Sequence, residues 1–158
     1  MDTAQELAEL FRRDITRLLQ ELTSFPDDGT LWRTLPGVSN SAGNLALHLE
    51  GNLREFVGRQ LGGVDYHRQR DVEFTSTGLS IDDLVTKMTK VKELIPSVVS
   101  RLSRSELEAT YPEEVLGKRL STQEFLIHLY GHLNYHLGQI DYLRRISTSG
   151  TAVQFVGL

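Results

Sequence analysis

The sequence predicts an all-α protein in which four long helices form a four-helix bundle. Four stretches carry apolar residues every three or four positions, which is the period of an amphipathic helix. Breaks with Gly, Pro and small polar residues separate them, and no stretch alternates as a half-buried strand would. With 158 residues, 39% of them hydrophobic and 24% charged, the chain is expected to fold as one domain over residues 1–158.

The first two helices are bounded by start and stop signals. The first is expected over residues 3–23, and the segment 25–29, with its Pro and Gly, should end it. The second should begin near residues 39–41, where serine side chains can cap a helix, and continue to about residue 61, before a Gly pair. Residues 64–80 show no clear period and are expected to form a long loop.

The third helix should begin at Ser80 and carry an apolar stripe to about residue 102. Pro96 lies inside this stripe and is expected to kink the helix or split it in two, because proline lacks the N–H that a helix needs. A short helical turn is expected at residues 103–109. Residues 110–120 should form a second loop.

The fourth helix has clear signals at both ends. Ser121 and Glu124 have the spacing of a capping box. Apolar residues then continue to Ile146, and Arg144 and Arg145 fall in the last turn, where the helix dipole favours positive charge.

Charge and composition restrict the function classes. The net charge of -4 argues against nucleic acid as the main partner. The chain has no cysteine, so a metal site would have to use His, Asp, Glu, carbonyl groups or water. There is no apolar run of membrane-spanning length and no signal-peptide pattern. We therefore expect a cytoplasmic protein that acts on a small molecule and has neither a nucleic acid nor a membrane as partner.

Three of the five histidines are expected to face the core. At roughly 100° per residue, His136 falls inside the apolar arc of the fourth helix and His132 falls at its edge. His48 flanks the apolar arc of the second helix. His128 lies further out and is expected to be a bystander, and His67 is expected to be a loop residue.

Inward-facing imidazoles need partners, because an unpaired buried polar group costs about 1–3 kcal/mol. Three of them from two helices could share one divalent metal ion, and three His ligands with an open position form a known catalytic zinc site. Nickel, iron and copper also accept His ligands. Gln139, Asn52 and Glu55 are candidates to orient the ligands. The spacing alone fits satisfied core histidines as well, so both interpretations stay open at this point.

Two segments resemble the DinB-like superfamily of metal-binding four-helix bundles. One is residues 44–53 (NLALHLEGNL) in the second predicted helix, and the other is residues 128–140 (HLYGHLNYHLGQI) in the fourth. Residues 68–74 (RQRDVEF) resemble one largely uncharacterised branch of that superfamily. The likeness covers most of the chain.

The resemblance implies an up-down-down-up order of the four helices. It also implies a metal ion held by His48, His132 and His136. Zinc, nickel and iron all occur in relatives. Some relatives transfer low-molecular-weight thiols such as bacillithiol or mycothiol to electrophiles, or use them in isomerisation, and others have no assigned activity. Many relatives are dimers.

Three functions are compatible with these features. The first is a metal-dependent enzyme that transfers a low-molecular-weight thiol to an electrophilic small molecule, the ion favouring the thiolate. Arg68 and Arg70 are then candidate cofactor-binding residues, and Glu55 and Asp71 are candidate catalytic residues for proton transfer. The second is a metal-dependent hydrolase, and the third is a non-catalytic, stress-related metal-binding bundle.

Four glycines indicate close helix packing. Gly51 and Gly58 are seven residues apart, as are Gly131 and Gly138, and all four lie away from the histidines on their helices. A glycine inside a helix costs up to about 1 kcal/mol relative to alanine. The close packing could lie within one bundle or across the interface of a homodimer, and a homodimer is the expected partner.

Overall fold

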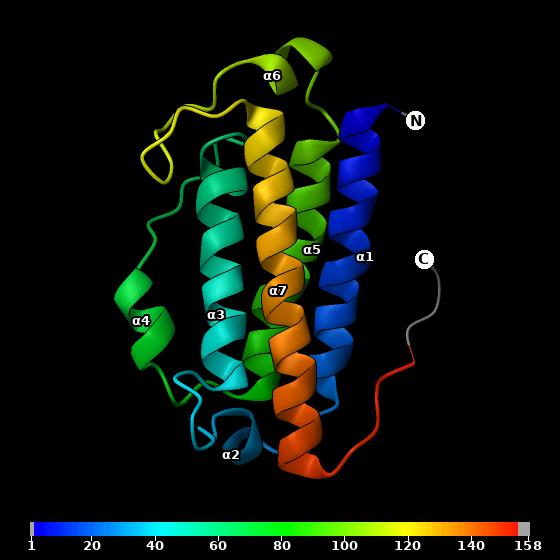
Figure 1. Cartoon of the computed structure of the whole chain (residues 1–158), viewed down its shortest axis with the longest axis vertical. Coiled ribbons are helices and arrows are strands. Elements are labelled where there is room, and N and C mark those ends of the chain that lie inside the picture. Colours follow the sequence, from blue (N-terminus) through cyan, green and yellow to red (C-terminus); the bar gives the residue numbers. More distant parts are fainter. Residues whose placement is uncertain (1, 155–158) are drawn as a thin grey trace.

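The computed structural model describes residues 2–154, which are mostly helical and form no β-strand. Four long helices lie side by side (Figure 1): α1 (Thr3–Thr23), α3 (Ala42–Leu53), α5 (Ile81–Val99) and α7 (Thr122–Thr148). The shorter elements are α2 (Asp28–Leu31), the π-helical η1 (Arg54–Arg59), α4 (Arg70–Thr75) and α6 (Arg104–Glu108). Among the described helices, none combines the length and the apolar character needed to cross a membrane.

Each long helix begins at a side-chain cap. Asp2, Ser41, Ser80 and Ser121 precede α1, α3, α5 and α7, and a side-chain oxygen of each accepts a hydrogen bond from the backbone N–H three residues later. These bonds satisfy N–H groups that have no partner within the helix. At Ser41 the capping box is complete, because Asn44 also accepts from its backbone N–H. At Ser121 only the first half of the predicted box is formed within the described residues.

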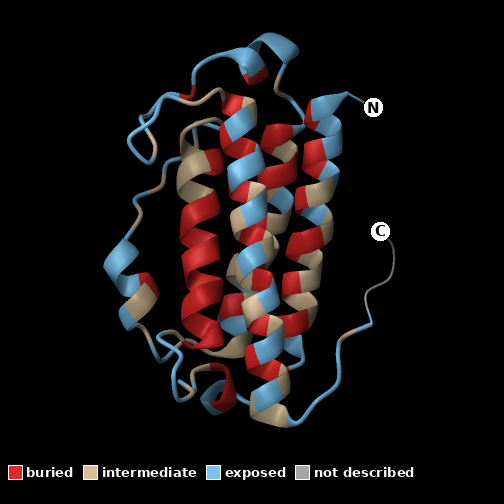
Figure 2. Ribbon diagram, viewed as in Figure 1, coloured by how far each residue is buried: buried red, intermediate tan, exposed pale blue. Residues whose placement is uncertain are grey.

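The core lies between the four long helices and contains the apolar stripes that the sequence predicts (Figure 2). The largest fully buried side chains include Phe11, Ile15, Leu18 and Leu22 from α1, Leu49 and Leu53 from α3, Leu84, Met88 and Ile95 from α5, and Phe125 and Leu126 from α7. All twelve residues of α3 are buried, because α4 covers the face of α3 that points away from the other long helices (Figure 1). Polar residues on α3 must therefore find partners inside the protein.

Pro96 does not divide the third helix, which is continuous from Ile81 to Val99. Of the two expected effects, the split does not occur: Pro96 lies in the last turn, so the one helical bond that its missing N–H removes is close to the end of the helix at Val99. The Pro96 carbonyl still accepts a hydrogen bond from the N–H of Ser100 at 2.9 Å. The short helix expected after it is present as α6.

Two elements differ from the prediction for residues 39–80. The second helix changes to the π-helical η1 after Leu53, and π-helical turns occur often at functional sites. The expectation of an irregular loop over residues 64–80 is wrong for residues 70–75, which form α4. A helix of six residues spans less than two turns, so it has no repeated apolar stripe that the sequence could show.

Two of the four helix glycines pack within the chain. A Cβ on Gly58 would lie 3.0 Å from the Cδ2 of Leu94 on α5, and a Cβ on Gly51 would meet Glu73 on α4. For this pair, close packing inside one chain is therefore the correct interpretation.

A fully buried carboxylate joins α1 to α7. Asp14 accepts hydrogen bonds from Arg13 at 2.8 and 2.9 Å, from the Tyr130 hydroxyl at 2.7 Å and from the Asn134 amide at 3.0 Å. Burial tends to raise the pKa of Asp14, but these hydrogen bonds outweigh burial and hold the pKa below its ordinary value. Asp14 therefore remains an ionised acceptor that connects the first and last helices.

A second buried ion pair links the same two helices near their other ends. The Nε of Arg144 on α7 lies 2.5 Å from Oε2 of Glu21 on α1, and both side chains are buried. Burial raises the pKa of Glu21, and the hydrogen bond from Arg144 offsets only part of this effect. Arg144 thus neutralises an internal carboxylate. Of the two arginines predicted for the last turn, only Arg145 lies there, because the helix continues to Thr148.

Replacing Arg144 with methionine should lower the free energy of unfolding by about 3–5 kcal/mol, because Glu21 would stay buried without its partner. Urea denaturation at pH 7 measures this loss. Arg145→Met is the matched control, since the Arg145 side chain is 37% exposed and pairs with Asp141 at 3.4 Å. The control should change the stability by about 0.5 kcal/mol or less, and equal losses in both variants would contradict the prediction.

Candidate metal centre

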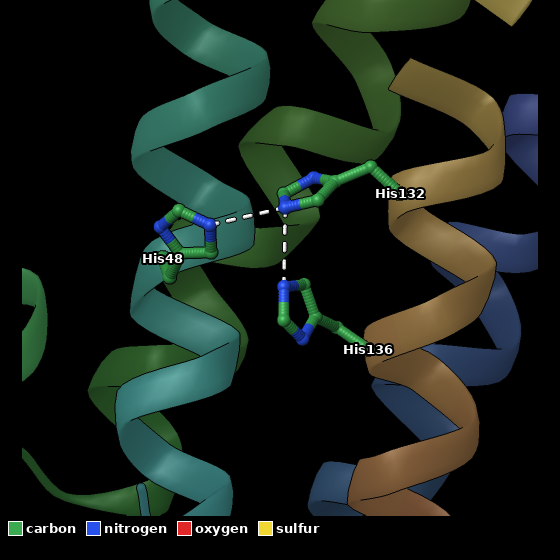
Figure 3. A group of neighbouring side chains, drawn as sticks. All are labelled: His48, His132 and His136. Atoms are coloured by element: carbon green, nitrogen blue, oxygen red, sulfur yellow. Dashed lines mark hydrogen bonds between the residues drawn. The ribbon is translucent and has the colours of Figure 1, made fainter. Parts of the chain in front are cut away.

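His48 on α3 and His132 and His136 on α7 point toward one another (Figure 3). Nε2 of His132 lies 3.1 Å from Nε2 of His48 and 3.1 Å from Nε2 of His136. One ring nitrogen from each residue can be chosen so that all three lie within 4.8 Å of one another. The structure thus brings together the three imidazoles that the sequence singles out.

The ring of His48 is held at its other nitrogen by Glu73 of α4. Nδ1 lies 2.9 Å from Glu73 Oε2, and the same carboxylate accepts from Arg68 Nε at 2.7 Å and Nη2 at 2.8 Å. Burial tends to raise the pKa of Glu73, but the hydrogen bonds from Arg68 and His48 outweigh it and lower the pKa. An ionised carboxylate only accepts, so His48 carries a proton on Nδ1, and in the neutral ring Nε2 then has the lone pair.

The ring of His136 is held in the same way by an amide. Its Nδ1 lies 2.6 Å from Oε1 of Gln139, one turn further along α7. Because an amide oxygen accepts, the proton of His136 also sits on Nδ1 and its Nε2 also carries a lone pair. Both lone pairs point at Nε2 of His132, which has at most one proton when the ring is neutral. The cluster therefore contains more acceptors than donors, and a shared cation would correct this imbalance.

Burial favours the neutral form of the two histidine rings on α7. Burial, followed by the proximity of His136 and His48, lowers the pKa of His132 to about 4. Burial also lowers the pKa of His136, although the hydrogen bond with Gln139 opposes this effect. His132 Nδ1 is buried and has no hydrogen-bond partner within residues 2–154. Neutral imidazole is the form that binds a metal ion, so burial keeps these two rings in that form near pH 7.

Two of the three nitrogen spacings are close to those around a small divalent cation. A tetrahedral zinc ion with Zn–N bonds of about 2.0–2.1 Å holds its ligand nitrogens about 3.3–3.4 Å apart, and the two contacts of His132 are 3.1 Å. The third pair, His48 and His136, lies within 4.8 Å. The Nδ1 hydrogen bonds of His48 and His136 are of the kind that orient metal-bound histidines. Three protein ligands would leave a fourth position for water or a substrate.

Of the three residues predicted to orient the ligands, Gln139 contacts the cluster, and so does Arg68, which the sequence predicts as a cofactor-binding residue. Gln139 binds His136 as described above. Arg68 reaches His48 directly, with its Nη2 3.3 Å from the His48 Nδ1. Asn52 is buried, but its Oδ1 has no hydrogen-bond partner in the described part of the chain.

The remaining candidates for proton transfer and cofactor binding lie outside the cluster. Glu55 is bound by Arg59 on η1. The guanidinium of Arg70 lies 5.3 Å from the centre of the Phe74 ring. Asp71 is exposed at the start of α4. No contact between these side chains and the three histidines is found within residues 2–154, so their predicted roles stay predictions.

The two other histidines are placed as the sequence predicts. His128 is exposed and stacks on Phe125, with the ring centroids 5.9 Å apart. His67 is exposed in the connection before α4. Neither belongs to the group of three.

Glu73 is the residue that sequence reasoning missed. Its neighbours Arg68, Arg70 and Asp71 were all selected as candidates, whereas Glu73 looked like one more polar residue of a loop. Only the presence of α4 turns Glu73 inward, to a relative exposure of 6%. The sequence gives little sign of this position, because α4 is too short to show a helical period.

Comparison with known proteins identifies the family. The sequence profile of the DinB superfamily matches residues 4–140, a range that includes all three histidines. The chain belongs to the DinB superfamily. No curated protein was found to match it.

Two solved structures share the DinB fold of this chain. A DinB-like protein from Bacillus cereus ATCC 10987 superposes with a TM-score of 0.71, at 17% sequence identity, over 94% of this chain and 94% of its own. A conserved protein from Enterococcus faecalis superposes with a TM-score of 0.76, at 14% identity, over 95% of this chain and 99% of its own. At such identities the likeness establishes the shared helical fold alone.

The low pKa of His132 has a measurable consequence. In the metal-free folded protein, an NMR titration should show the His132 ring protonating near pH 4, whereas in urea it should protonate near the ordinary value of about 6.5. Since the unfolded chain binds this proton first, His132 should lower the stability progressively as the pH falls from about 6.5 toward 4. Urea melts of the wild type and His132→Gln measure this part of the loss. A midpoint near 6.5 in the folded protein would contradict the prediction.

Proposed function

We propose that this DinB superfamily protein binds one divalent metal ion, either zinc, nickel or iron, through His48, His132 and His136. We further propose that it is an enzyme that transfers a low-molecular-weight thiol to an electrophilic small molecule. The observation that carries the proposal is the convergence of three imidazoles, two of which are bound at their outer nitrogens by acceptors and direct Nε2 toward the third. The Nε2 atoms that face one another outnumber the N–H groups available to bond them, and a cation can bind such unpaired nitrogens.

When bound, a divalent ion in such a site lowers the pKa of a coordinated thiol or water, so that a nucleophile is available near neutral pH. The chain itself holds the ligands neutral and offers a place for the reactants. A cavity of about 550 Å³ is lined by Glu55, Arg68 and Arg70 among others. Arg68 also holds Glu73, so this cavity adjoins the support of the histidine cluster.

Within this cavity, we propose that Arg68 and Arg70 bind negatively charged groups of the thiol cofactor. Glu55 is the better of the two candidates for accepting a proton, because its carboxylate lines the cavity. Asp71 is exposed and is not part of the cavity lining.

Two alternatives use the same residues. An open fourth position would serve a water molecule as well as a thiol, which corresponds to a metal-dependent hydrolase. In a non-catalytic stress-related protein, the ion would instead stabilise the fold. A structural ion contributes directly to folding stability, so chelation would then lower the melting temperature strongly.

The purified protein should contain one divalent ion per chain by elemental analysis, and His136→Ala should lose both the ion and turnover because the site would lose one of three ligands. His67→Ala, at an exposed position outside the cluster, should keep the ion. Thiol–electrophile pairs, esters and amides tested side by side identify the reaction. Full turnover in a metal-free preparation would refute metal dependence, and a loaded protein inactive on the whole panel would favour the non-catalytic alternative.

We also propose that the four long helices follow the up-down-down-up order that the resemblance implies. The colour sequence of the ribbons supports this order, since α1 and α7 descend in Figure 1 whereas α3 and α5 ascend.

We propose a homodimer formed through the outer face of α7. Exposed residues at spacings of four, four, three, four and four form a stripe there: Ile127, Gly131, Tyr135, Gly138, Tyr142 and Ile146. A Cβ on either glycine of the stripe would meet nothing within 4 Å, so packing inside the chain does not account for this pair. The spacings read the same in both directions.

Such a stripe is self-complementary across a two-fold axis. In an antiparallel pair of α7 helices, Tyr135 of one protomer would face Gly138 of its partner, and Tyr142 would face Gly131. Glu124, which is exposed, would then lie within one turn of Arg145 of the partner subunit, so the charges are complementary too. The tyrosine rings of each protomer would thus pack against the glycines of its partner, where the helix surface has no side chain.

Gly138→Leu should convert the dimer to a monomer, because a leucine would occupy the space that Tyr135 of the partner subunit needs. Light scattering should give about twice the chain mass of 17.8 kDa for the wild type and the single-chain mass for the variant. Thr86→Leu adds the same side chain at an exposed position of α5 and should stay dimeric. A monomeric wild type, or a variant that still dimerises, would refute this interface.

A further inference from the structure

We infer that Glu73 is a positioning residue of the metal site, and that Gly51 is glycine because Glu73 occupies the space where a side chain would lie. The inference rests on the proposed metal binding and concerns the orientation and proton position of one proposed ligand, His48. Glu73 would select the form of the His48 ring in which Nε2 offers its lone pair to the ion.

The first step concerns which nitrogen of His48 carries the proton. Two side chains reach Nδ1: the carboxylate of Glu73 at 2.9 Å and Nη2 of Arg68 at 3.3 Å. They favour opposite ring forms, because a carboxylate accepts a proton and a guanidinium only donates. With Glu73 in place, Nδ1 is the donor and Nε2 is free to bind. With Arg68 alone, Nδ1 would accept, and the proton would sit on Nε2, where it blocks a metal ion.

The second step concerns what holds Glu73. Arg68 binds both carboxylate oxygens, at 2.7 and 2.8 Å, and fixes the carboxylate. Its Nη2 lies closer to Glu73 Oε2, at 2.8 Å, than to the His48 ring, at 3.3 Å, so the carboxylate is its nearer partner. Asn44 of α3 holds the backbone of α4 with its amide, which donates to the carbonyls of Glu73 at 3.1 Å and Ser76 at 3.0 Å. The carboxylate is thus fixed both through its oxygens and through its main chain.

The third step concerns the space that Glu73 occupies. A Cβ on Gly51 would lie 2.1 Å from Glu73 Oε1 and 2.9 Å from its Cδ, distances at which atoms overlap. Gly51 is three residues after His48 on the same buried helix. Any side chain there would push the carboxylate from its position between His48 and Arg68. Gly51 weakens the helix as any internal glycine does, but it lets the carboxylate of Glu73 approach the backbone of α3 closely.

The test measures the affinity for Zn²⁺ and Co²⁺ by competition with a chromophoric chelator. Glu73→Ala and Gly51→Ala should each weaken binding by about 10- to 100-fold, as expected for the loss of a group that orients a ligand. Arg68→Ala combined with Glu73→Ala should bind more tightly than Glu73→Ala alone, because the guanidinium that favours the wrong ring form is gone. A merely structural role would not give this recovery.

Two controls are matched to these variants. Glu50→Gln alters the carboxylate next to Gly51 that binds Arg54, at 2.9 Å, rather than a histidine. Gly78→Ala makes the same glycine-to-alanine change between α4 and α5, at an exposed position where the added Cβ would meet nothing within 4 Å. Both controls should keep wild-type affinity.

A second measurement needs no metal ion. Nitrogen-15 NMR of the metal-free protein should show the proton of His48 on Nδ1 in the wild type and on Nε2 in Glu73→Ala. If the wild type binds no metal ion, the proposed function fails, and this spectrum still decides the role of Glu73. The inference is overturned if His48 keeps the same ring form in both proteins, or if Glu73→Ala and Gly51→Ala bind within twofold of the wild type.

Discussion

The hydrogen bonds at the outer nitrogens of His48 and His136 are the constraint on which the histidine cluster depends. Each bond goes to an oxygen that only accepts, so each ring in its neutral form presents an unprotonated nitrogen inward. His132 receives both lone pairs and cannot satisfy both with one proton. The bundle thus encloses three Nε2 atoms whose hydrogen bonds it does not fully satisfy by itself. The buried apolar core offsets the free-energy cost of this arrangement.

The sequence is sufficient for the long helices and for the three histidines that converge. Helical phase alone brings His132 and His136 to the inner side of one helix and His48 to the edge of another, because a long helix repeats its period often enough to fix the direction of each side chain. The caps at Ser41 and Ser80 mark helix starts for the same local reason. Helix starts and side-chain directions on long helices could be predicted because they depend on residues that are close together in the chain.

The parts that sequence reasoning missed depend on contacts between distant segments. Glu73 faces inward only because α4 docks on α3, and a six-residue helix carries no readable period. The change to a π-helix after Leu53 left no mark that was recognised. Gly51 was noticed, but its neighbour could not be named, because the atoms that fill its space come from a segment 22 positions away in the printed sequence. Burial of Arg144 against Glu21 was hidden for the same reason.

Asn44 has two tasks in this protein, and they join the start of one helix to the position of another. Its side-chain oxygen completes the cap that starts α3, while its amide group holds the backbone of α4. The held backbone includes Glu73, whose carboxylate binds the ring of His48. The beginning of α3 and the orientation of the His48 ring thus depend on the same amide side chain.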